Sequence, residues 1–129
     1  MNNLGPYLLV VTAEIDADVE DEWNEWYDKV HLPAALSCPG IMSGTRYVSQ
    51  GEASYIDHGR RTTSSTRVYT TIYQIEGTDT VQTPEFQAMR GWYQFSEKIT
   101  ARTQIIKSLK NLHQKILNRY ESVHHTFRH

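Results

Sequence analysis

Three stretches of the chain have the apolar and β-branched pattern of strands, at residues 7–15, 41–49 and 67–76. The first, YLLVVTAEI, is apolar along nearly its whole length, which is typical of a strand buried on both faces. The third, RVYTTIYQIE, is dense in Val, Tyr, Thr and Ile, which strands favour. The pattern therefore predicts a sheet assembled from segments that lie far apart in the sequence.

A helical pattern lies between the first two predicted strands and runs to about Leu36. The residues at spacings of three and four along its apolar face are Trp23, Trp26, Tyr27, Val30, His31 and Ala34. Asp18 is a candidate N-cap, and the acidic residues 20–22 would interact favourably with the helix dipole. Pro33 removes a backbone donor inside this helix, so we expect a kink or a tight last turn there.

The second half of the chain is less regular. Residues 50–66 are polar and rich in Gly, Ser and Thr, which predicts a long hairpin connection with partial pairing at most; such lengths usually serve a site or a partner. A second helix is expected from Thr83, a candidate N-cap that precedes Pro84. Its inner side would carry Phe86, Met89, Arg90 and Tyr93. Residues 96–120 fit both a helical and an alternating spacing.

The order of these elements fits a four-stranded antiparallel sheet with two helices on one face, an α+β architecture. The strands at 7–15 and 67–76 place large residues on both of their sides, so the face without helices would expose Val, Ile and Tyr. A patch of that size is seldom left in water. Pairing two such sheets face to face would bury it, and we therefore predict a homodimer.

Composition narrows the class of protein. The chain has 129 residues, of which 39% are hydrophobic and 22% charged, with a formal net charge of −2. We expect one globular domain over residues 1–129, with a frayed tail from about residue 121, and no general nucleic-acid binding. Its one cysteine, Cys38, allows no internal disulfide, and no stretch approaches the ~18–20 apolar residues of a membrane span. Without a visible signal peptide, a cytoplasmic location is the default expectation.

The candidate chemistry centres on His31. A free imidazole titrates near pH ~6.5, so it can give or take a proton at neutral pH. Tyr27 lies one helical turn earlier on the same face, and Trp23 one turn before that. A base beside a phenol donor suits proton abstraction next to a carbonyl, with Trp23 and Trp26 as pocket walls. The alternative is a structural role in which His31 caps the helix end or bonds a loop carbonyl.

Further polar candidates lie on the strands and in the hairpin connection. Arg46 and Tyr47 are neighbours on a strand and point to opposite faces, so at most one of them reaches the pocket. Arg46 could bind a substrate carboxylate or pair with the acidic turn. Tyr69 suits core or dimer packing as well as a cavity wall. His58, which precedes two arginines, could form an anion-binding lid or belong to an ordinary exposed loop.

Other chemistries have less support. Cys38 follows the predicted helix, so a nucleophilic pair with His31 is one option, whereas a small hydrophobic role is typical of a lone cysteine in a turn. We expect no metal site. The chain has neither a G-x-G-x-x-G motif nor a P-loop, and it lacks G-x-S-x-G, so neither a nucleotide cofactor nor an ordinary serine hydrolase is expected.

Residues 22–47 resemble a known family. Their pattern is E-W-x-x-W-Y-D-x-x-H-L-P-x-x-L-x-x-P-G-I, which continues into T-R-Y. This pattern is similar to that of the dimeric α+β barrel superfamily, in particular its EthD-like members. In these proteins, an early helix with a histidine, a hydrophobic residue and a proline precedes a Pro-Gly turn. The second helix is similar more weakly, through P-E-F and the later Trp92.

The resemblance implies a ferredoxin-like βαββαβ fold, with a fourth strand at about residues 111–120 and a helical segment before it. It implies a pocket between the helices and the sheet, where a histidine or a His–Tyr pair transfers protons without a cofactor. The expected function is a cofactor-independent isomerase, lyase or ester hydrolase acting on a small unsaturated carbonyl or carboxylate compound of aromatic catabolism. The alternatives are a non-enzymatic small-molecule-binding or stress-response dimer, and a haem-binding protein.

Overall fold

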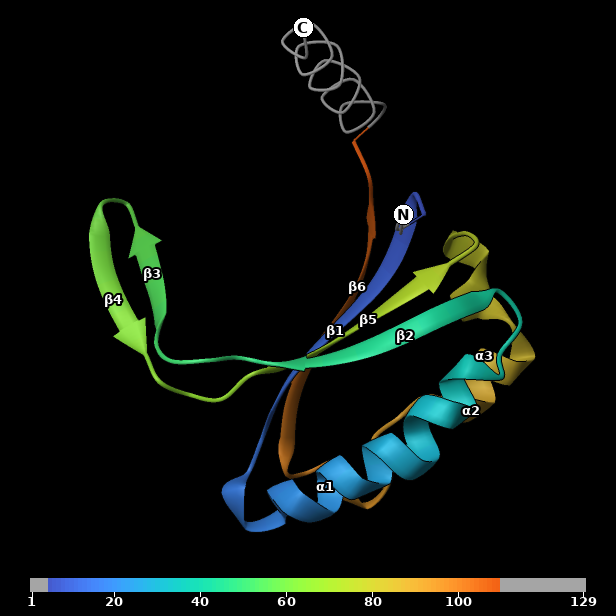
Figure 1. Cartoon of the computed structure of the whole chain (residues 1–129), viewed down its shortest axis with the longest axis horizontal. Coiled ribbons are helices and arrows are strands. Elements are labelled where there is room, and N and C mark those ends of the chain that lie inside the picture. The colour runs from blue at the N-terminus through green and yellow to red at the C-terminus, as the bar shows by residue number, and fades with distance from the viewer. Residues whose placement is uncertain (1–4, 110–129) are drawn as a thin grey trace, which may run out of the picture.

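One four-stranded sheet, with helices on one of its faces, forms the body of the protein in the computed structural model, which describes residues 5–109 (Figure 1). The strands β1 (Tyr7–Ile15), β2 (Ile41–Val48), β5 (Tyr69–Ile75) and β6 (Ile99–Lys107) are hydrogen-bonded in the order β2-β5-β1-β6, and every pair is antiparallel. Apart from the hairpin formed by β3 (Ala53–Asp57) and β4 (Arg60–Ser64), the order of strands and helices along the chain is βαββαβ. The predicted ferredoxin-like α+β fold is therefore confirmed.

The first helical run contains a π turn. A short 3-10 turn at Ala17–Val19 leads into α1 (Glu20–Trp26), the π turn η2 (Tyr27–His31) and α2 (Leu32–Leu36). The wide turn is closed by the Leu32 amide, which donates to the carbonyl of Tyr27. Pro33 stands in the first turn of α2, where its missing N–H needs no partner. The sequence predicted a kink or a tight last turn at Pro33, whereas the structure has a wide π turn before the proline and a regular helical turn at it.

The predicted N-cap at Asp18 is wrong. Asp18 lies within the 3-10 turn, and its carboxylate accepts a hydrogen bond from Lys98 Nζ at 3.1 Å. Val19 occupies the cap position of α1 without a side-chain bond to the helix. The added turn moves the helix start past the aspartate, and the acidic residues 20–22 then fill the first turn of α1, as expected from the helix dipole.

The second helical region is broken into short pieces. It comprises the 3-10 turn η3 (Thr78–Gln82), α3 (Pro84–Met89) and the 3-10 turn η4 (Tyr93–Phe95). Thr83 is the N-cap as predicted, because its side chain accepts from the Phe86 amide at 3.2 Å. The helix stops at Met89 because Gly91 has a φ of 117°, a conformation that favours glycine. Tyr93 is consequently 69% exposed instead of lying on the inner side.

The predicted helical segment before a strand at 111–120 is also wrong. Residues 99–107 form β6, which pairs with β1 along its whole length, from Ile15 opposite Ile99 to Tyr7 opposite Lys107. Ile105 faces the helices and Ile106 the other side, so their apparent helical spacing arises from a strand with apolar residues on both faces. The expected strand at 111–120 and the frayed tail from about residue 121 lie outside the described residues.

The connection at 50–66 is a β-hairpin that projects from the sheet (Figure 1). Its strands β3 (Ala53–Asp57) and β4 (Arg60–Ser64) are joined by His58 and Gly59, with φ values of 50° and 83°. Two consecutive positive φ values are the mark of a tight hairpin turn. Every residue of β3 is exposed. The pairing is therefore more complete than predicted, and the hairpin extends away from the helices.

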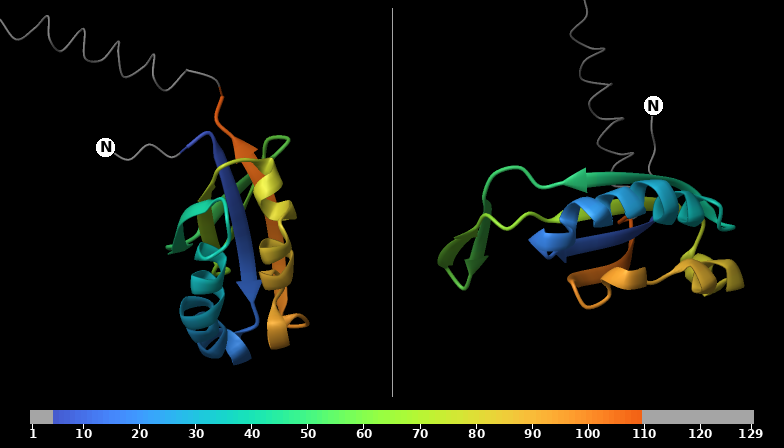
Figure 2. Two further views of the ribbon diagram at one scale, coloured as in Figure 1. Left: turned by 90° about the vertical axis from the view of Figure 1, so that its right-hand side faces the viewer. Right: turned by 90° about the horizontal axis from the view of Figure 1, so that it is seen from below.

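The core lies between the sheet and the helices (Figure 2). One cluster gathers residues of β1, β2 and β5 against α2 and α3, and it includes Leu9, Tyr73 and Phe86. A second cluster packs Trp23 and Tyr27 against Ala13 and Phe95. On the opposite face, the half-buried Leu8, Val10 and Ile72 alternate with these core residues, and no helix within residues 5–109 covers them.

Candidate functional site

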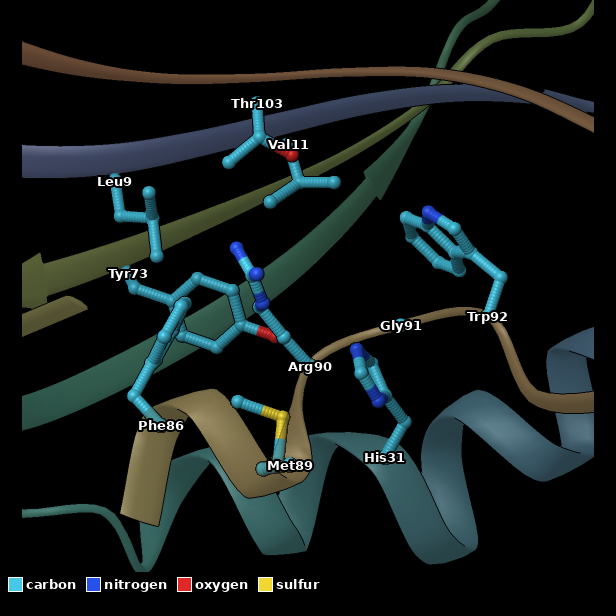
Figure 3. Close-up of a pocket in the computed structure, with 10 residues that line it drawn as sticks. All are labelled: Leu9, Val11, His31, Tyr73, Phe86, Met89, Arg90, Gly91, Trp92 and Thr103. Atoms are coloured by element: carbon cyan, nitrogen blue, oxygen red, sulfur yellow. The ribbon is translucent and has the colours of Figure 1, made fainter. Parts of the chain in front are cut away.

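A cavity of about 360 Å³ opens between the sheet and the two helical regions (Figure 3). Its lining is mainly apolar and aromatic, with an imidazole, a phenol, a hydroxyl and a guanidinium among the walls. The lining residues are Leu9, Val11, His31, Tyr73, Phe86, Met89, Arg90, Gly91, Trp92 and Thr103. A small apolar space with a few convergent polar groups is typical of a ligand-binding site.

His31 ends the π turn and points into this cavity (Figure 3). Its side chain is enclosed by aromatic rings. The Trp26 ring stacks on it with centroids 4.6 Å apart, and Tyr27 meets it edge-on at 4.8 Å. Within residues 5–109, the imidazole has no hydrogen-bond partner. Burial, together with the positive charge of Arg46, lowers the pKa of His31 to about 4, so the ring is neutral at pH 7 and can accept a proton.

Tyr73 supplies a phenol on the opposite wall. It is buried on β5, and its hydroxyl lies 3.4 Å from the hydroxyl of Tyr27. Burial and the adjacent Tyr27 raise the pKa of Tyr73 above its ordinary value, so the hydroxyl stays protonated and available as a donor. Gly44 of β2 leaves room for the ring, since a Cβ atom there would lie 2.8 Å from its Cδ1. Figure 3 shows the hydroxyl directed toward the side of the cavity where His31 stands.

Arg46 does not line this cavity, although it faces the helices. Its guanidinium donates to Asp28 Oδ1 at 2.7 Å and to Asn24 Oδ1 at 2.8 Å. It also lies over the Tyr27 ring, 4.1 Å from the centroid. The sequence offered an ion pair with the acidic turn at residues 16–21 as the alternative role of Arg46, but the partner is Asp28 in the π turn. Arg46 acts on the cavity indirectly, through its charge and through Tyr27.

Trp23 and Tyr69 belong to the packing behind Tyr27. Trp23 is fully buried, and its ring centroid lies 5.4 Å from that of Tyr27 and 5.0 Å from that of Tyr69. The Tyr69 hydroxyl donates to Glu20 Oε2 at 2.5 Å and accepts from the Asn24 amide at 3.0 Å. The first of these bonds is the main cause that lowers the pKa of Glu20. These contacts fix β5 to α1, and neither ring reaches the cavity lining.

Tyr47, His58 and Cys38 also lie away from the cavity. Tyr47 is on the sheet face opposite the helices and is 54% exposed. The His58 side chain is 97% exposed at the hairpin turn, where Nδ1 lies 2.6 Å from Asp57 Oδ1. Cys38 packs in the core, and its thiol donates to the Ala34 carbonyl at 3.5 Å. Burial raises the pKa of this thiol, so it is a poor nucleophile.

The structure therefore brings together His31, Trp26 and Tyr27 from the predicted set and adds Tyr73, Arg90 and Trp92. Trp92 packs 5.6 Å from His31, measured between ring centroids. The sequence indicates these three residues only weakly as members of the site. Tyr73 is one of several alternating strand residues, and residues 90 and 92 face the cavity only because the chain turns at Gly91.

Two structural features associated with other classes of protein are absent from residues 5–109. Residues 5–109 contain no group of three or more His, Cys, Asp or Glu side chains placed to hold a metal ion. None of the helices in this part of the chain is long and apolar enough to cross a membrane.

Solved structures with the same fold are recognisable despite low sequence identity. The chain is similar to HapK from Hahella chejuensis, with a TM-score of 0.53 and 11% identity over 81% of this chain and 93% of HapK. It is similar to an ethyl tert-butyl ether D (EthD) family protein from Bacillus halodurans, with a TM-score of 0.51 and 14% identity over 80% of this chain and 99% of that protein. No protein-family model and no curated protein matches the sequence.

At such identities the likeness concerns the fold. It confirms the predicted resemblance to the EthD-like proteins and the dimeric α+β barrel superfamily at that level. The cavity beside His31 lies between the helices and the sheet, where the resemblance implied a pocket. Because one fold serves many reactions, a specific function has to be argued from the residues of the cavity.

Proposed function

We propose that this chain is a cofactor-independent enzyme that moves a proton on a small unsaturated carbonyl or carboxylate compound, with His31 as the general base. One observation carries the proposal: a neutral imidazole without a hydrogen-bond partner among residues 5–109 faces an apolar cavity across from a protonated phenol. General acid–base catalysis needs a group in the correct protonation state within reach of the substrate. His31 meets the first condition, and its place in the cavity lining supports the second.

In this mechanism, His31 takes a proton from a carbon next to the substrate carbonyl. The electron pair of the broken C–H bond moves into the carbonyl, and the Tyr73 hydroxyl donates a hydrogen bond to the resulting enolate oxygen. Return of the proton to another carbon gives an isomer, whereas departure of a leaving group gives elimination. Tyr27 serves as a positioning residue, because its hydroxyl lies 3.4 Å from that of Tyr73 and its ring contacts His31.

The low pKa of His31 favours an activated substrate. With a pKa of about 4, His31 is in its unprotonated form throughout the neutral pH range, but it has a low affinity for protons and is therefore a weak base. It is matched to carbon acids in which the negative charge spreads over a conjugated system. A weak base of this kind favours unsaturated carbonyl compounds, whose enolates are stabilised by conjugation, over simple ketones.

The test is hydrogen exchange on candidate substrates. Unsaturated keto acids and lactones are incubated with the protein in D₂O, and the loss of C–H signals is followed by proton NMR. The His31→Ala variant should exchange or turn over at a rate lower by about 10²-fold or more. A folded His31→Ala variant with undiminished turnover contradicts the assignment. Saturable binding of these compounds with neither exchange nor product favours the alternative, a small-molecule-binding protein.

The same proposal includes a homodimer in which two sheets pair through their uncovered faces. Leu8 and Val10 of β1 and Ile72 of β5 give this face an apolar centre, while Tyr47 and Ile106 on the outer strands are 54% and 40% exposed. Large apolar side chains on one continuous face mark an association surface. A second copy of the chain offers the same surface, and a two-fold arrangement makes the two faces self-complementary.

A further inference from the structure

We propose that Arg90 is the anion-binding residue of the cavity, and that the ligand is a monocarboxylate with a conjugated or aromatic body. This inference rests on the proposed function, because it names the chemical class of the ligand that the same cavity accepts. It replaces Arg46 and His58, the sequence candidates for holding an anionic group, because the contacts of both residues lie elsewhere.

The backbone around Arg90 directs this side chain to the cavity. Arg90 is the C-cap of α3, with an extended conformation at φ −65° and ψ 159°, and its amide donates to the carbonyl of Phe86. Gly91 follows with a φ of 117° and reverses the chain, so that Trp92 lines the cavity as well. Figure 3 shows the Arg90 side chain leaving this turn and extending toward the sheet, on the same side as Tyr73.

The charge of Arg90 is not balanced by the protein. Its side chain has no hydrogen bond or ion pair within residues 5–109, and the cavity lining contains no carboxylate. His31 is neutral, while Arg46 is already held by Asp28 and Asn24. Arg90 is thus the one lining residue with a full charge. A guanidinium binds a carboxylate through two parallel hydrogen bonds, a geometry that suits an acid better than a neutral carbonyl.

The position of Arg90 at the opening of the cavity defines how the ligand would lie. The residue is exposed and also lines two neighbouring surface depressions, one beside Trp26 and one beside Val81. A carboxylate bound there keeps contact with solvent. The rest of the ligand would enter between Leu9 and Trp92, toward His31 and Tyr73. A second negative charge, or a cation, would be buried in this part of the cavity without a partner at a large cost in free energy.

The experiment compares two probes of nearly equal shape. Binding of trans-cinnamate and trans-cinnamamide to the whole chain is measured by calorimetry or by NMR titration. Because an ion pair that keeps contact with solvent is only weakly stabilising, we expect the acid to bind up to about 5-fold more tightly than the amide. Arg90→Gln should remove this preference by weakening acid binding more than amide binding, whereas Arg90→Lys should keep part of it. Arg60→Gln, the same change at an exposed hairpin position, should leave both affinities as they are.

Three results overturn the inference. Equal binding of both probes by the unaltered chain, or an undiminished acid preference in Arg90→Gln, removes Arg90 as the anchor. If neither probe binds at all, the cavity itself is not a site for such ligands, and the inference falls with it. Failure of the catalytic proposal looks different, because undiminished turnover of His31→Ala does not alter the ratio of acid to amide affinity.

Discussion

The guanidinium of Arg46 lies 4.1 Å from the centroid of the Tyr27 ring, and the same ring meets His31 edge-on with centroids 4.8 Å apart. A permanent cation is therefore held one aromatic ring away from the candidate base. Asp28 and Asn24 keep the guanidinium in place. The protonated form of His31 is disfavoured by this charge as well as by burial, and the protein thereby keeps an uncharged base in the cavity.

Replacing Arg46 with Gln should raise the pKa of His31 above its value of about 4. Burial is the larger cause of the depression, so the pKa should remain below the ordinary value of about 6.5. The measurement is an NMR titration of the His31 ring protons. Arg102→Gln removes the same charge from a strand position outside the cavity lining and serves as the control. An unchanged His31 pKa in a folded Arg46→Gln variant would contradict this electrostatic role.

The free energy of unfolding should fall as the pH drops from about 6.5 toward 4. The folded chain holds His31 with a pKa of about 4, below the ordinary value, so between these limits the unfolded chain binds the additional proton. Stability from this group is present above pH ~6.5, is lost on acidification, and amounts to at most about 3 kcal/mol.

Urea denaturation of the unaltered chain and of His31→Gln, at several pH values, checks this dependence. Protonation of Glu20 and other carboxylates also destabilises the folded state in acid, so the informative quantity is the difference between the two proteins. That difference should shrink as the pH falls. Parallel pH profiles would show that His31 titrates alike in the folded and unfolded chains.

Tyr73→Phe should lower turnover by about 10²-fold if its hydroxyl stabilises the enolate oxygen, which is the usual cost of removing one such donor. Tyr27→Phe should cost less, because the Tyr27 hydroxyl contacts that of Tyr73 instead of lining the cavity. Steady-state kinetics on a substrate found by the exchange screen measure both effects. Equal losses in the two variants would argue that the hydroxyl pair acts as a unit.

Gly44→Ala should destabilise the fold by about 1–3 kcal/mol, the usual cost of overpacking a core. The added Cβ would lie 2.8 Å from the Tyr73 ring and 3.2 Å from a Leu32 methyl, so the ring or the helix has to move. Thermal unfolding measures the loss. Thr63→Ala, at an exposed position of β4 in the projecting hairpin, is the control and should change stability far less.

The uncovered sheet face can be tested by introducing a charge. In light scattering after size-exclusion chromatography, the unaltered protein should have about twice the chain mass of 15.0 kDa. Val10→Glu should give the monomer mass, because a carboxylate at the centre of the apolar face would be buried on association. Arg61→Glu on the projecting hairpin introduces the same residue elsewhere and should leave the mass unchanged. A monomeric unaltered chain would exclude the face-to-face dimer.

The parts of the fold that depend on local pattern were predictable from the sequence. The strand at 7–15 has the predicted bounds, Thr83 caps α3, and the spacing of Trp26, Tyr27 and His31 places three rings in contact. Local pattern failed for residues 99–107, because adjacent isoleucines on the two faces of a strand also fit a helix. The pairing of this segment with β1 decides its structure, and pairing partners are not visible in the segment itself.

The cavity was predictable only on its helical side. Tyr73 reaches His31 through the pairing of β5 with β1 and β2, which a single strand pattern does not reveal. The helical spacing predicts Arg90 on the inner side of a longer helix. The residue does line the cavity, but from the turn at which that helix ends after Met89 and before Gly91. The sequence pattern favours Arg46 and His58 as anion-binding residues, but their charged partners are Asp28 and Asp57.

The π turn at Tyr27–His31 sets the angular position of the imidazole. In an α-helix, a step of four residues overshoots one full rotation by about 40°, so a row of side chains at that interval spirals away from the sheet. The wider turn offsets this drift, and Trp23, Tyr27, His31 and Ala35 all remain buried on one side. Deleting a single residue from the turn would rotate the imidazole by roughly 100° about the helix axis. The ring itself would be unchanged, but it would lose its contacts with the cavity and with the neighbouring aromatic rings.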